Sequence, residues 1–495
     1  MGEMFSIWLC FEGLFIIGIT HLVYKWRNPK CRGRLPPGSM GMPLIGETFQ
    51  FFTHGNSLDL PPFLKKGMEK YGSLFKTSVA GRPVVISSDP EFNYFIINQE
   101  GKLVQKWYMD SLSKTTDRGE FPTTVSADKI TKYLRNLVLK HFGPETLKQK
   151  LLPPVEEMVR RHLRLWSTKE SVEVQLSLLS MVFDLTAKLL FNYETDITQL
   201  SESYVSQLFT NFSEIMMCFP LNIPGTALYR ALKNKEKAVN MLKGILEERR
   251  RAIPNRSHGD ILDHVIQDMR DETFLSDNFV ATTMFSILSA NIEPIATSIA
   301  LAIILLTDHP SVLQELRDEH EAIISSRRVN NTDSTITWDE YKSMTFTSYV
   351  INETFRLANI TFGILSKAIR DIEINGYTIP SGWTIMIVPT AVHLNPNLFE
   401  DPLAFNPWRW KDLGSTASCK NFLTFGGGMR ACLGADYCRM VMAIFLHILV
   451  TNYRWTKIKG GDIIRTPILQ FPNGFHIKIW EMKSWRTTER VFTER

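Results

Sequence analysis

The sequence predicts a mainly α-helical protein with minor β structure, organised as one large domain behind an N-terminal hydrophobic helix. Three observations lead to this prediction: an apolar run near the N-terminus, helical periodicity over most of the chain, and two short clusters of strand-like sequence. A chain of 495 residues is long enough for two or three average domains. Because no linker-like segment follows residue 50, a single large domain is the better prediction.

The N-terminal apolar run covers residues 4–23, about the length that crosses a bilayer as a helix. Glu12 lies inside it and would cost about 3 kcal/mol at the centre of a membrane. Basic residues follow from Lys25 to Arg34, which predicts that the rest of the chain stays on the cytosolic side. A cleaved signal peptide is the alternative, but the run has no basic segment before it and no small-residue cleavage site after it. We therefore expect a single-pass transmembrane anchor at residues 1–24.

The segment that follows the anchor, residues 25–46, is basic and rich in proline and glycine. Proline fixes the backbone angle φ and cannot lie inside a helix, so we expect a stiff hinge. The globular domain would then cover residues 47–495. Helical periodicity marks five long ranges within it: 155–166, 178–191, 232–251, 277–307 and 312–325.

Strand-like sequence gathers in two places. Residues 73–78 and 81–87 predict a hairpin in a small sheet. Residues 372–380 and 384–388 form the second cluster, where the Asn375-Gly376 pair is typical of a hairpin turn.

The composition is that of a globular protein, with 44% hydrophobic and 22% charged residues and a net charge of +5. There is no basic stripe interleaved with aromatic residues, so nucleic-acid binding is not expected. Six scattered cysteines form neither a disulfide framework nor a Cys-x-x-Cys pair for zinc. They indicate a reducing compartment.

The segment that carries chemistry lies at residues 425–434, Phe-Gly-Gly-Gly-Met-Arg-Ala-Cys-Leu-Gly. Glycines let a backbone lie flat against a planar group, and Arg430 places a permanent cation two residues before Cys432. A helical pattern at residues 435–453 would direct its positive end at the sulfur and lower the pKa of the thiol. The plain alternative is a glycine-rich turn that precedes a buried helix and holds an inert cysteine.

Every fixed position of Phe-x-x-Gly-x-Arg-x-Cys-x-Gly is matched, by Phe425, Gly428, Arg430, Cys432 and Gly434. This pattern resembles the haem-binding signature of the cytochrome P-450 superfamily. The resemblance implies a single large haem domain with haem b as cofactor and Cys432 as the axial ligand of its iron. The other four residues would then belong to the cofactor-binding set.

Further segments resemble the same family. Glu353-Thr354-Phe355-Arg356 is similar to its Glu-x-x-Arg helix, and Arg409 lies where the family closes a buried structural triad with Glu353 and Arg356. Such a triad would hold the cysteine loop in register. An ordinary ion pair on a helix surface is the alternative.

Two basic residues, Lys132 and Arg135, resemble those that supply cations to a haem propionate, with a solvated basic face as the alternative. The family usually has Trp or His four residues before that arginine, whereas this chain has Thr131. A further propionate-binding arginine that is common in the family is replaced by Ser366.

One departure from the family concerns the long helix expected over the distal face of the haem. There the chain reads Ala-Asn-Ile-Glu-Pro-Ile at 290–295, so the usual acid is present as Glu293 and the usual threonine is Pro294. Proline removes a backbone donor, and a kink would free carbonyls for an ordered water. Asn291, Glu293 and water are the candidates to replace the threonine in proton delivery.

Two enzymatic hypotheses follow from this departure. The first is a monooxygenase that uses O2 and obtains electrons from NADPH through a flavoprotein reductase. The reductase would dock on a basic face that comprises Lys132, Arg135, Lys140 and Arg439. The second is a reductase-independent isomerase or lyase. A non-enzymatic haem-binding or sensing protein is a third class.

The chain most resembles the plant branch of the family that oxidises sterols, brassinosteroids and triterpenoids, particularly around residues 391–410. This implies a domain anchored in the endoplasmic reticulum membrane that hydroxylates a sterol or triterpenoid, including successive steps that end in side-chain cleavage. The segments expected to contact this hydrophobic substrate are 107–123, 209–220, 284–293, 359–365 and 471–475.

Overall fold

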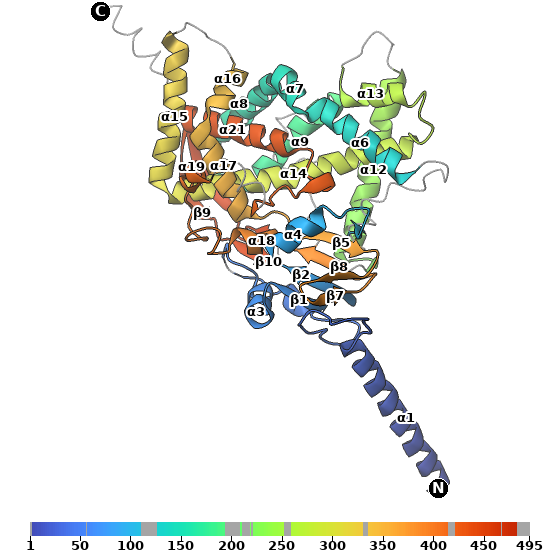
Figure 1. Ribbon diagram of the computed structural model, residues 1–495. Helices are drawn as coiled ribbons and strands as arrows, with labels where there is room; N and C mark the ends of the chain where they lie inside the picture. The colour runs from blue at the N-terminus through green and yellow to red at the C-terminus, as the bar shows by residue number, and fades with distance from the viewer. Residues whose placement is uncertain are drawn as a thin grey trace, which may run out of the picture.

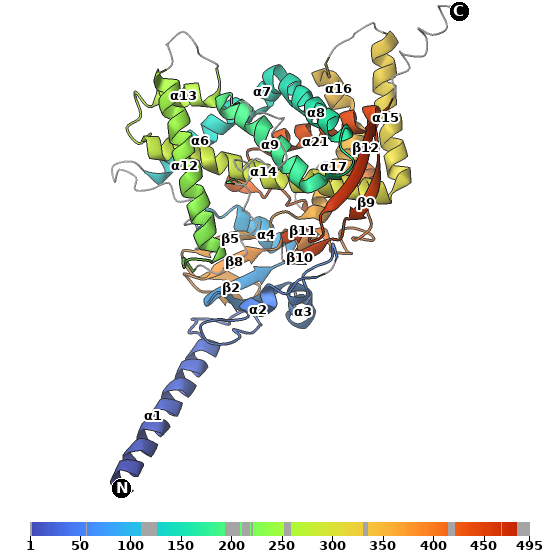
Figure 2. The same ribbon diagram turned by 180° about the vertical axis from the view of Figure 1, so that it is seen from behind.

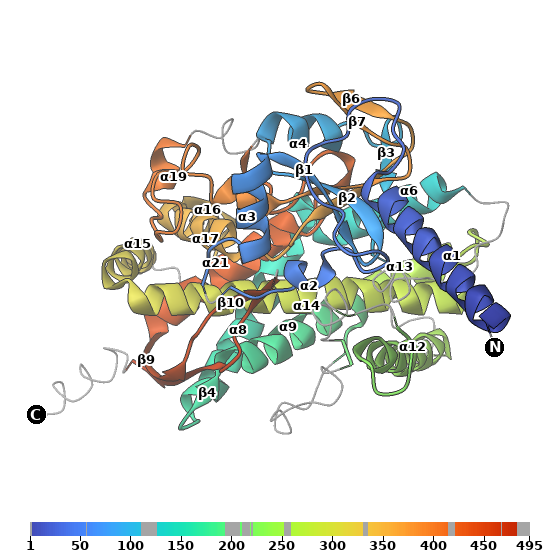
Figure 3. The same ribbon diagram turned by 90° about the horizontal axis from the view of Figure 1, so that it is seen from below.

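The computed structural model describes residues 2–55, 57–109, 126–193, 208–209, 218, 221–251, 259–329, 335–413, 421–466 and 468–482. A helical body lies above a small β-sheet, and one long helix, α1 (Gly2–Arg27), projects away from the sheet side (Figure 1). The same arrangement is seen from behind in Figure 2 and from below in Figure 3. The predicted fold class, mainly α with minor β, is confirmed.

The largest sheet has five strands in the order β1-β2-β8-β5-β3. Strands β2 and β8 pair in parallel, and the other neighbours are antiparallel. The predicted hairpin is β1–β2, and the predicted strand 384–388 is β8. The bounds are β1 Leu74–Val79, β2 Arg82–Ser87, β3 Val104–Lys106, β5 Ile364–Ala368 and β8 Thr384–Ile387.

The second predicted hairpin is formed by β6 (Ile372–Ile374) and β7 (Tyr377–Ile379). Asn375 and Gly376 both have positive φ, 50° and 75°. The common two-residue hairpin turn requires positive φ at both of its central residues. Two further sheets come from segments that the sequence pattern did not identify. Their strands are β4 Val172–Glu173, β9 Tyr453–Gly460, β10 Ile464–Thr466, β11 Ile468–Gln470 and β12 Phe475–Glu481.

The helices that the periodicity predicts are all present. Five extend beyond their predicted ranges at one or both ends, and the helix predicted at residues 435–453 ends one residue earlier. They are α8 Leu152–Ser167, α9 Val174–Phe191, α12 Ala227–Arg251, α14 Asp277–Asp308, α15 Pro310–Val329 and α21 Ala435–Asn452. The remaining α-helices are α2 Thr48–Phe51, α3 Pro62–Tyr71, α4 Pro90–Ile97, α6 Ala127–Phe142, α7 Pro144–Thr146, α13 Ile261–Asp268, α16 Trp338–Ser343, α17 Thr345–Ala358, α18 Pro389–His393 and α19 Arg409–Asp412. A π-helix, η1, covers Leu147–Leu151, and a short 3-10 helix, η3, covers Gly428–Arg430.

Helix α14 runs through the centre of the body, packed against α9, α12 and α17. It begins at Ser276, whose hydroxyl accepts a hydrogen bond from the N–H of Phe279. Its second half, from Ile295 to Leu306, is buried at every position. The helix continues through Pro294 without interruption, although proline would break an isolated helix, because the residues that follow it are buried in the core.

Helix α1 exposes large apolar side chains, among them Leu14, Phe15, Ile16 and Ile17, each at least 62% exposed. The segment that follows α1 is fastened to the β structure by backbone hydrogen bonds from Lys76 to Pro37 and from Thr378 to Arg34, both 2.7 Å. Within the helical body, α9 and α14 are long and apolar enough to cross a membrane. Both are mostly buried within the body, which identifies them as core helices.

Candidate cofactor site

The loop before α21 adopts a compact form that its glycines permit. The N–H of Cys432 donates to the carbonyl oxygen of Phe425 at 2.9 Å, which closes the loop. Gly428 has φ +60°, and a Cβ there would lie 2.8 Å from the carbonyl oxygen of Ile97. A side chain at position 428 would therefore be strained by its backbone angle and by contact with α4.

The Cys432 side chain is exposed, yet protein surrounds it closely enough for burial to raise the pKa of the thiol. A hydrogen bond from the backbone N–H of Gly434 acts in the opposite direction. The sequence predicted a lowered thiol pKa, and this prediction is wrong, because desolvation raises the pKa of Cys432 more than the N–H of Gly434 lowers it. A metal cation bound to the sulfur would reverse that balance.

Gly434 lies between Cys432 and the central helix α14. A Cβ built on Gly434 would be 4.0 Å from the Cys432 sulfur and 3.8 Å from Oδ1 of Asn291, both ordinary van der Waals distances. Since φ is −94°, neither the backbone nor these neighbours demand a glycine. A side chain at 434 would instead extend into the space beside the sulfur.

The stretch of α14 that faces this loop is accessible, although most of the helix is buried. Ala290 is exposed, and Asn291, Glu293 and Pro294 are half-buried. Pro294 has no N–H, so the carbonyl of Ala290, four residues back, lacks its helical donor. Ser298 donates to the carbonyl of Pro294 at 2.8 Å, in the following turn.

The predicted propionate partners lie in different environments. Arg430 is half-buried, donates to the carbonyl of Leu365 at 2.9 Å and pairs with the carboxylate of Glu100. Burial lowers the pKa of Arg430 to about 10. Arg135 is exposed and reaches the carbonyl of Met429, in the cysteine loop, at 3.4 Å. Lys132 is exposed on the same helix, α6.

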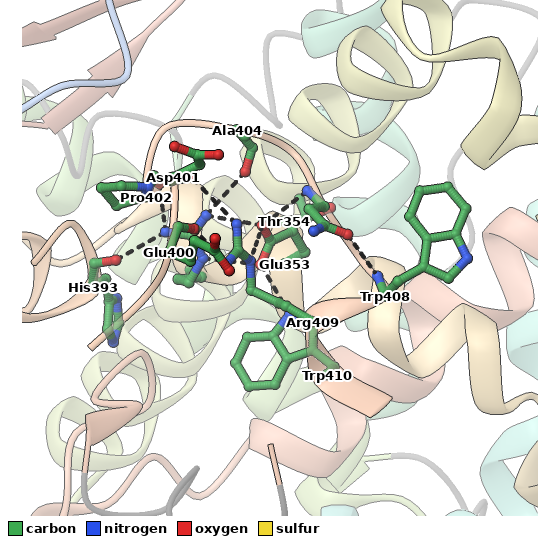
Figure 4. Close-up of polar contacts among 12 residues, drawn as sticks. Glu353, Thr354, His393, Glu400, Asp401, Pro402, Ala404, Trp408, Arg409 and Trp410 are labelled. Atoms are coloured by element: carbon green, nitrogen blue, oxygen red, sulfur yellow. Dashed lines mark hydrogen bonds and ion pairs between the residues drawn. The ribbon is translucent and has the colours of Figure 1, made fainter. Parts of the chain in front are cut away.

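Glu353, Arg356 and Arg409 form one ionic group, and Figure 4 shows Glu353 and Arg409 within it. Arg356 pairs with both oxygens of Glu353 at 2.9 Å, and Nε of Arg409 lies 3.0 Å from Oε1. Glu353 and Arg356 are fully buried. Removing one member of such a buried ionic group costs about 3–5 kcal/mol, because the other charges lose their partners.

The two arginines also bind backbone carbonyls of the segment before α19. Arg356 donates to the carbonyls of His393, Pro402 and Ala404, at 2.6 to 3.2 Å. Arg409 donates to the carbonyls of Glu400 and Asp401. The group therefore fixes a long irregular segment against α17.

His393 connects this group to the cysteine loop. Its Nε2 accepts a hydrogen bond from the N–H of Leu423 at 2.9 Å, and its Nδ1 lies 2.6 Å from Oδ1 of Asn359. Burial, with the nearby Arg356, lowers the pKa of His393 to about 3, so the ring is neutral. Because Nε2 accepts, Nδ1 carries the proton and donates to Asn359.

Four residues of this region were not assigned a role from the sequence: Glu100, His393, Trp410 and Arg465. Trp410 donates its indole N–H to Glu353, and its position beside Arg409 was the only signal for it. Arg465 is fully buried and donates to the carbonyls of Leu357 and Ala358, at the end of α17. Nothing in the local sequence of Glu100 or Arg465 points to these distant partners.

Parts of the expected substrate-contact segments lie outside the described residues, namely 110–123, 210–217 and 219–220. Within the described parts, Phe209, Met284 and Phe362 are buried apolar residues.

Comparison with known proteins identifies the family. The sequence profile described as Cytochrome P-450 matches residues 36–478. The beta-amyrin 16-alpha-hydroxylase of Maesa lanceolata and the cucurbitadienol 11-hydroxylase of Siraitia grosvenorii are each 43% identical, over 96% of this chain and 99% of their own lengths. The solved structure of a retinoic acid-bound cyanobacterial CYP120A1 superposes with a TM-score of 0.78, at 23% identity, over 91% of this chain and all of that one.

The solved structure supports the fold, and the family profile with the two plant relatives supports the haem-thiolate chemistry that the Cys432 loop predicts. The chain belongs to the cytochrome P-450 family and is a monooxygenase of the plant branch that includes triterpenoid and sterol hydroxylases.

Proposed function

We propose that this protein is a reductase-dependent monooxygenase of the endoplasmic reticulum membrane that hydroxylates a triterpenoid or sterol. The observation that carries the proposal is the accessible sulfur of Cys432, held in the signature loop opposite the accessible stretch of α14 at residues 290–294. The printed activities of the two plant relatives, hydroxylation of beta-amyrin and of cucurbitadienol, support the substrate class.

The residues present fit a haem. Gly434 leaves open the space beside the Cys432 sulfur, where a Cβ would otherwise extend. Phe425 and Gly428 shape the loop. Arg430, Arg135 and Lys132 would supply cations for the propionates, since Arg430 and Arg135 contact the loop or the strand beside it and Lys132 is exposed on the same helix as Arg135. When bound through Cys432, haem supplies oxygen activation, with the thiolate as electron donor to the iron.

Protein groups on α14 would deliver the protons that this chemistry consumes. Glu293 is half-buried in the accessible stretch and is our candidate for holding and passing a proton. The carbonyl of Ala290 lacks a helical N–H donor because of Pro294, so it can accept a hydrogen bond from a water in the relay. Asn291, the other residue predicted for this role, directs its carboxamide toward Gly434.

The triad Glu353, Arg356 and Arg409 would act only architecturally. Through His393 and the N–H of Leu423, it fixes the start of the loop that presents Cys432. The loop is therefore held from behind by a network that does not touch the reacting atoms.

Electrons would come from NADPH through a flavoprotein reductase. Lys132, Arg135 and Lys140 are exposed on one helix, α6, and offer a basic face to an acidic partner. Arg439 is half-buried and stacks over the ring of Phe425, 5.1 Å from its centroid, so it contributes less to this face. We propose that α1 anchors the domain as a single pass, with residues 25–46 as its connection and residues 47–495 as the catalytic domain.

A reductase-independent isomerase or lyase is the alternative, and Pro294 in place of the threonine is the observation that favours it. The two functions differ in their need for electrons. Successive hydroxylation that ends in side-chain cleavage is a variant of the main proposal and differs from it only in its products.

The test is incubation of microsomes that contain the full chain with beta-amyrin, cucurbitadienol and cholesterol, with and without NADPH and reductase. Hydroxylated products that require both additions support the monooxygenase, whereas products formed without them support the alternative. The Cys432→Ser variant is the control. It should lose the reduced-CO band near 450 nm that is diagnostic of a thiolate ligand, and a variant that kept the band would refute Cys432 as ligand.

A further inference from the structure

Leu44 lies in a tight turn between α1 and α2, and its side chain is 82% exposed. Its φ is +67°, which is unfavourable for a residue with a Cβ. The N–H of Ile45 donates to the carbonyl of Pro43 at 2.8 Å, which makes this a γ-turn of the rare, strained form with positive φ. A single exposed leucine is common in proteins, but backbone strain at the same residue indicates a function for that exposure.

The turn is held firmly in place. The N–H of Gly46 donates to the carbonyl of Met42 at 2.7 Å, and the N–H of Met42 donates back to the carbonyl of Gly46 at 3.2 Å. The N–H of Glu47 donates to the carbonyl of Ser78 at 2.7 Å, which fixes the turn to β1. The exposed position of Leu44 is therefore built into the fold.

Two further apolar side chains are exposed close to Leu44 in the chain. Met42, at the start of the turn, is 53% exposed, and Phe49, in α2, is 61% exposed. The hydroxyl of Thr48 donates to the carbonyl of Ile45, which ties α2 to the turn. Three large apolar side chains thus project from one short, well-braced segment.

The same segment is bonded to the end of α1. Trp26 donates its indole N–H to the carbonyl of the buried Met40 at 3.1 Å. Leu44 follows Met40 by four residues, at most about 14 Å of extended chain. If α1 spans the bilayer as proposed, Trp26 lies at the membrane surface, where this residue type is enriched. The turn then lies within reach of that surface, and Figure 2 shows α1 and α2 on the same side of the body.

The charges of this segment suit a membrane surface. Residues 25–46 contain no acidic residue. Their exposed cations are Lys25, Arg27, Lys30, Arg32 and Arg34. Glu47, the next acidic residue, accepts a hydrogen bond from the hydroxyl of Thr77 at 2.6 Å, so its carboxylate is engaged by β1. Cations of this kind are attracted to anionic lipid headgroups, and apolar side chains beside them enter the boundary between headgroups and acyl chains.

We propose that Met42, Leu44 and Phe49 form a second membrane contact, which enters the headgroup region of the bilayer that α1 spans. This inference rests on the proposed anchoring by α1 and goes beyond it. The bond from Trp26 to Met40 and the braced turn together hold the catalytic domain in one orientation on the membrane. Residues 25–46 then act as a rigid connection and not as a free tether.

The test uses the full-length chain in vesicles of phosphatidylcholine and phosphatidylserine, with the photoreactive residue benzoylphenylalanine in place of Phe49. The matched control carries the same probe in place of Trp408, an aromatic residue that is 38% exposed. Trp408 directly precedes α19, which lies in the helical body away from α1 (Figure 1). The probe at position 49 should form lipid adducts roughly tenfold more often than the probe at position 408, because only the former enters the membrane.

A second variant tests the turn itself. Leu44→Gly removes the apolar side chain and suits the positive φ of the turn, so the fold is retained. In the Leu44→Gly background, lipid adducts of the probe at position 49 should decrease several-fold. The reduced-CO band of each variant shows that the holoprotein is folded.

Lipid adducts at position 49 that were no more frequent than at position 408, or that Leu44→Gly left unchanged, would overturn the proposal. Adducts between two copies of the chain in place of lipid adducts would overturn it as well and would assign this surface to self-association. Failure of the proposed anchor is seen separately, because alkaline carbonate would then release the wild-type chain from the vesicles.

Discussion

The indole N–H of Trp410 donates to Oε2 of Glu353 at 2.9 Å, with both side chains buried. Glu353 also accepts from Arg356, from Arg409 and from the backbone N–H of Asn406. Five hydrogen bonds thus occupy the two carboxylate oxygens. A buried charge is tolerated when its hydrogen-bonding capacity is filled in this way, so each donor is needed.

Replacing Trp410 with Phe removes one donor from a buried carboxylate and should lower the free energy of unfolding by about 1.5–3 kcal/mol. Trp408→Phe is the matched control, because Trp408 is 38% exposed two residues earlier in the same segment. Its cost should stay below about 1 kcal/mol. Urea unfolding of both variants measures the difference. Equal costs would mean that the indole N–H contributes nothing to the triad.

Two glycines of the cysteine loop should respond differently to alanine. Gly428→Ala should destabilise the protein without cofactor by about 1–2 kcal/mol, because its φ of +60° is unfavourable for a residue with a Cβ. Gly434→Ala should leave the unfolding free energy of that form unchanged and weaken haem binding on the order of tenfold or more. Unfolding of the apoprotein and haem transfer to apomyoglobin separate the two effects. Full haem retention by Gly434→Ala would contradict the placement of the cofactor beside Gly434.

Buried neutral histidines predict a loss of stability in mild acid. His320 and His447 are in contact, Nδ1 to Nδ1 at 2.9 Å, and burial lowers the pKa of His320 to about 3 and that of His447 to about 2. In the unfolded chain both rings take up protons below pH 6.5, whereas in the folded protein they take up protons only at far lower pH. Each ring therefore contributes stability above pH 6.5 that declines as the pH falls, by about 1.4 kcal/mol per pH unit.

Urea unfolding between pH 6.5 and 4.5 measures this slope. In the His447→Gln variant, the unfolding free energy should fall less steeply with decreasing pH. The difference should be about 1.4 kcal/mol per pH unit, because one fewer ring takes up a proton on unfolding. A wild-type stability that stayed constant over this range would contradict the neutral assignment of these rings, and of His393 with them.

Glu293→Gln removes the proposed proton carrier of α14 and should lower product formation on the order of a hundredfold. Haem content and the reduced-CO band should stay unchanged, because the proposal assigns Glu293 to proton delivery and not to binding of the haem. Glu315→Gln, the same change on an exposed residue of α15, is the control and should keep full activity. The ratio of product formed to NADPH consumed is the measurement. If Glu293→Gln formed as much product per NADPH consumed as the wild type, Glu293 would not belong to the proton relay.

The elements with strong local patterns were predictable from the sequence. α14 and α21 carry long apolar sequences, and the Asn375-Gly376 turn requires positive φ, so each was predicted nearly to its ends. The loop around Cys432 was predictable because its chemistry depends on residues close together in the sequence.

Long-range pairings were not predictable in this way. Glu100 and Arg430 are separated by 330 positions, and no local preference of either residue indicates the other. The short strands of the C-terminal sheet depend on partners such as β4, which is 302 positions from β12 at Glu173 and Phe475. The orientation of Asn291 depends on how α14 crosses α21, and tertiary packing alone decides that angle.

Helices α9 and α14, both buried in the folded body, have a consequence for biosynthesis. If α1 directs the nascent chain to the translocon as proposed, two later segments have the length and hydropathy of membrane spans. A domain that folds on the cytosolic side, as proposed, would have to bury both helices before they insert into the bilayer. Glu293 would cost about 3 kcal/mol near the centre of an inserted α14, and Asn291 and Pro294 add to that penalty. The three residues that distinguish residues 290–294 from the usual family sequence would thus also help to keep this helix out of the membrane.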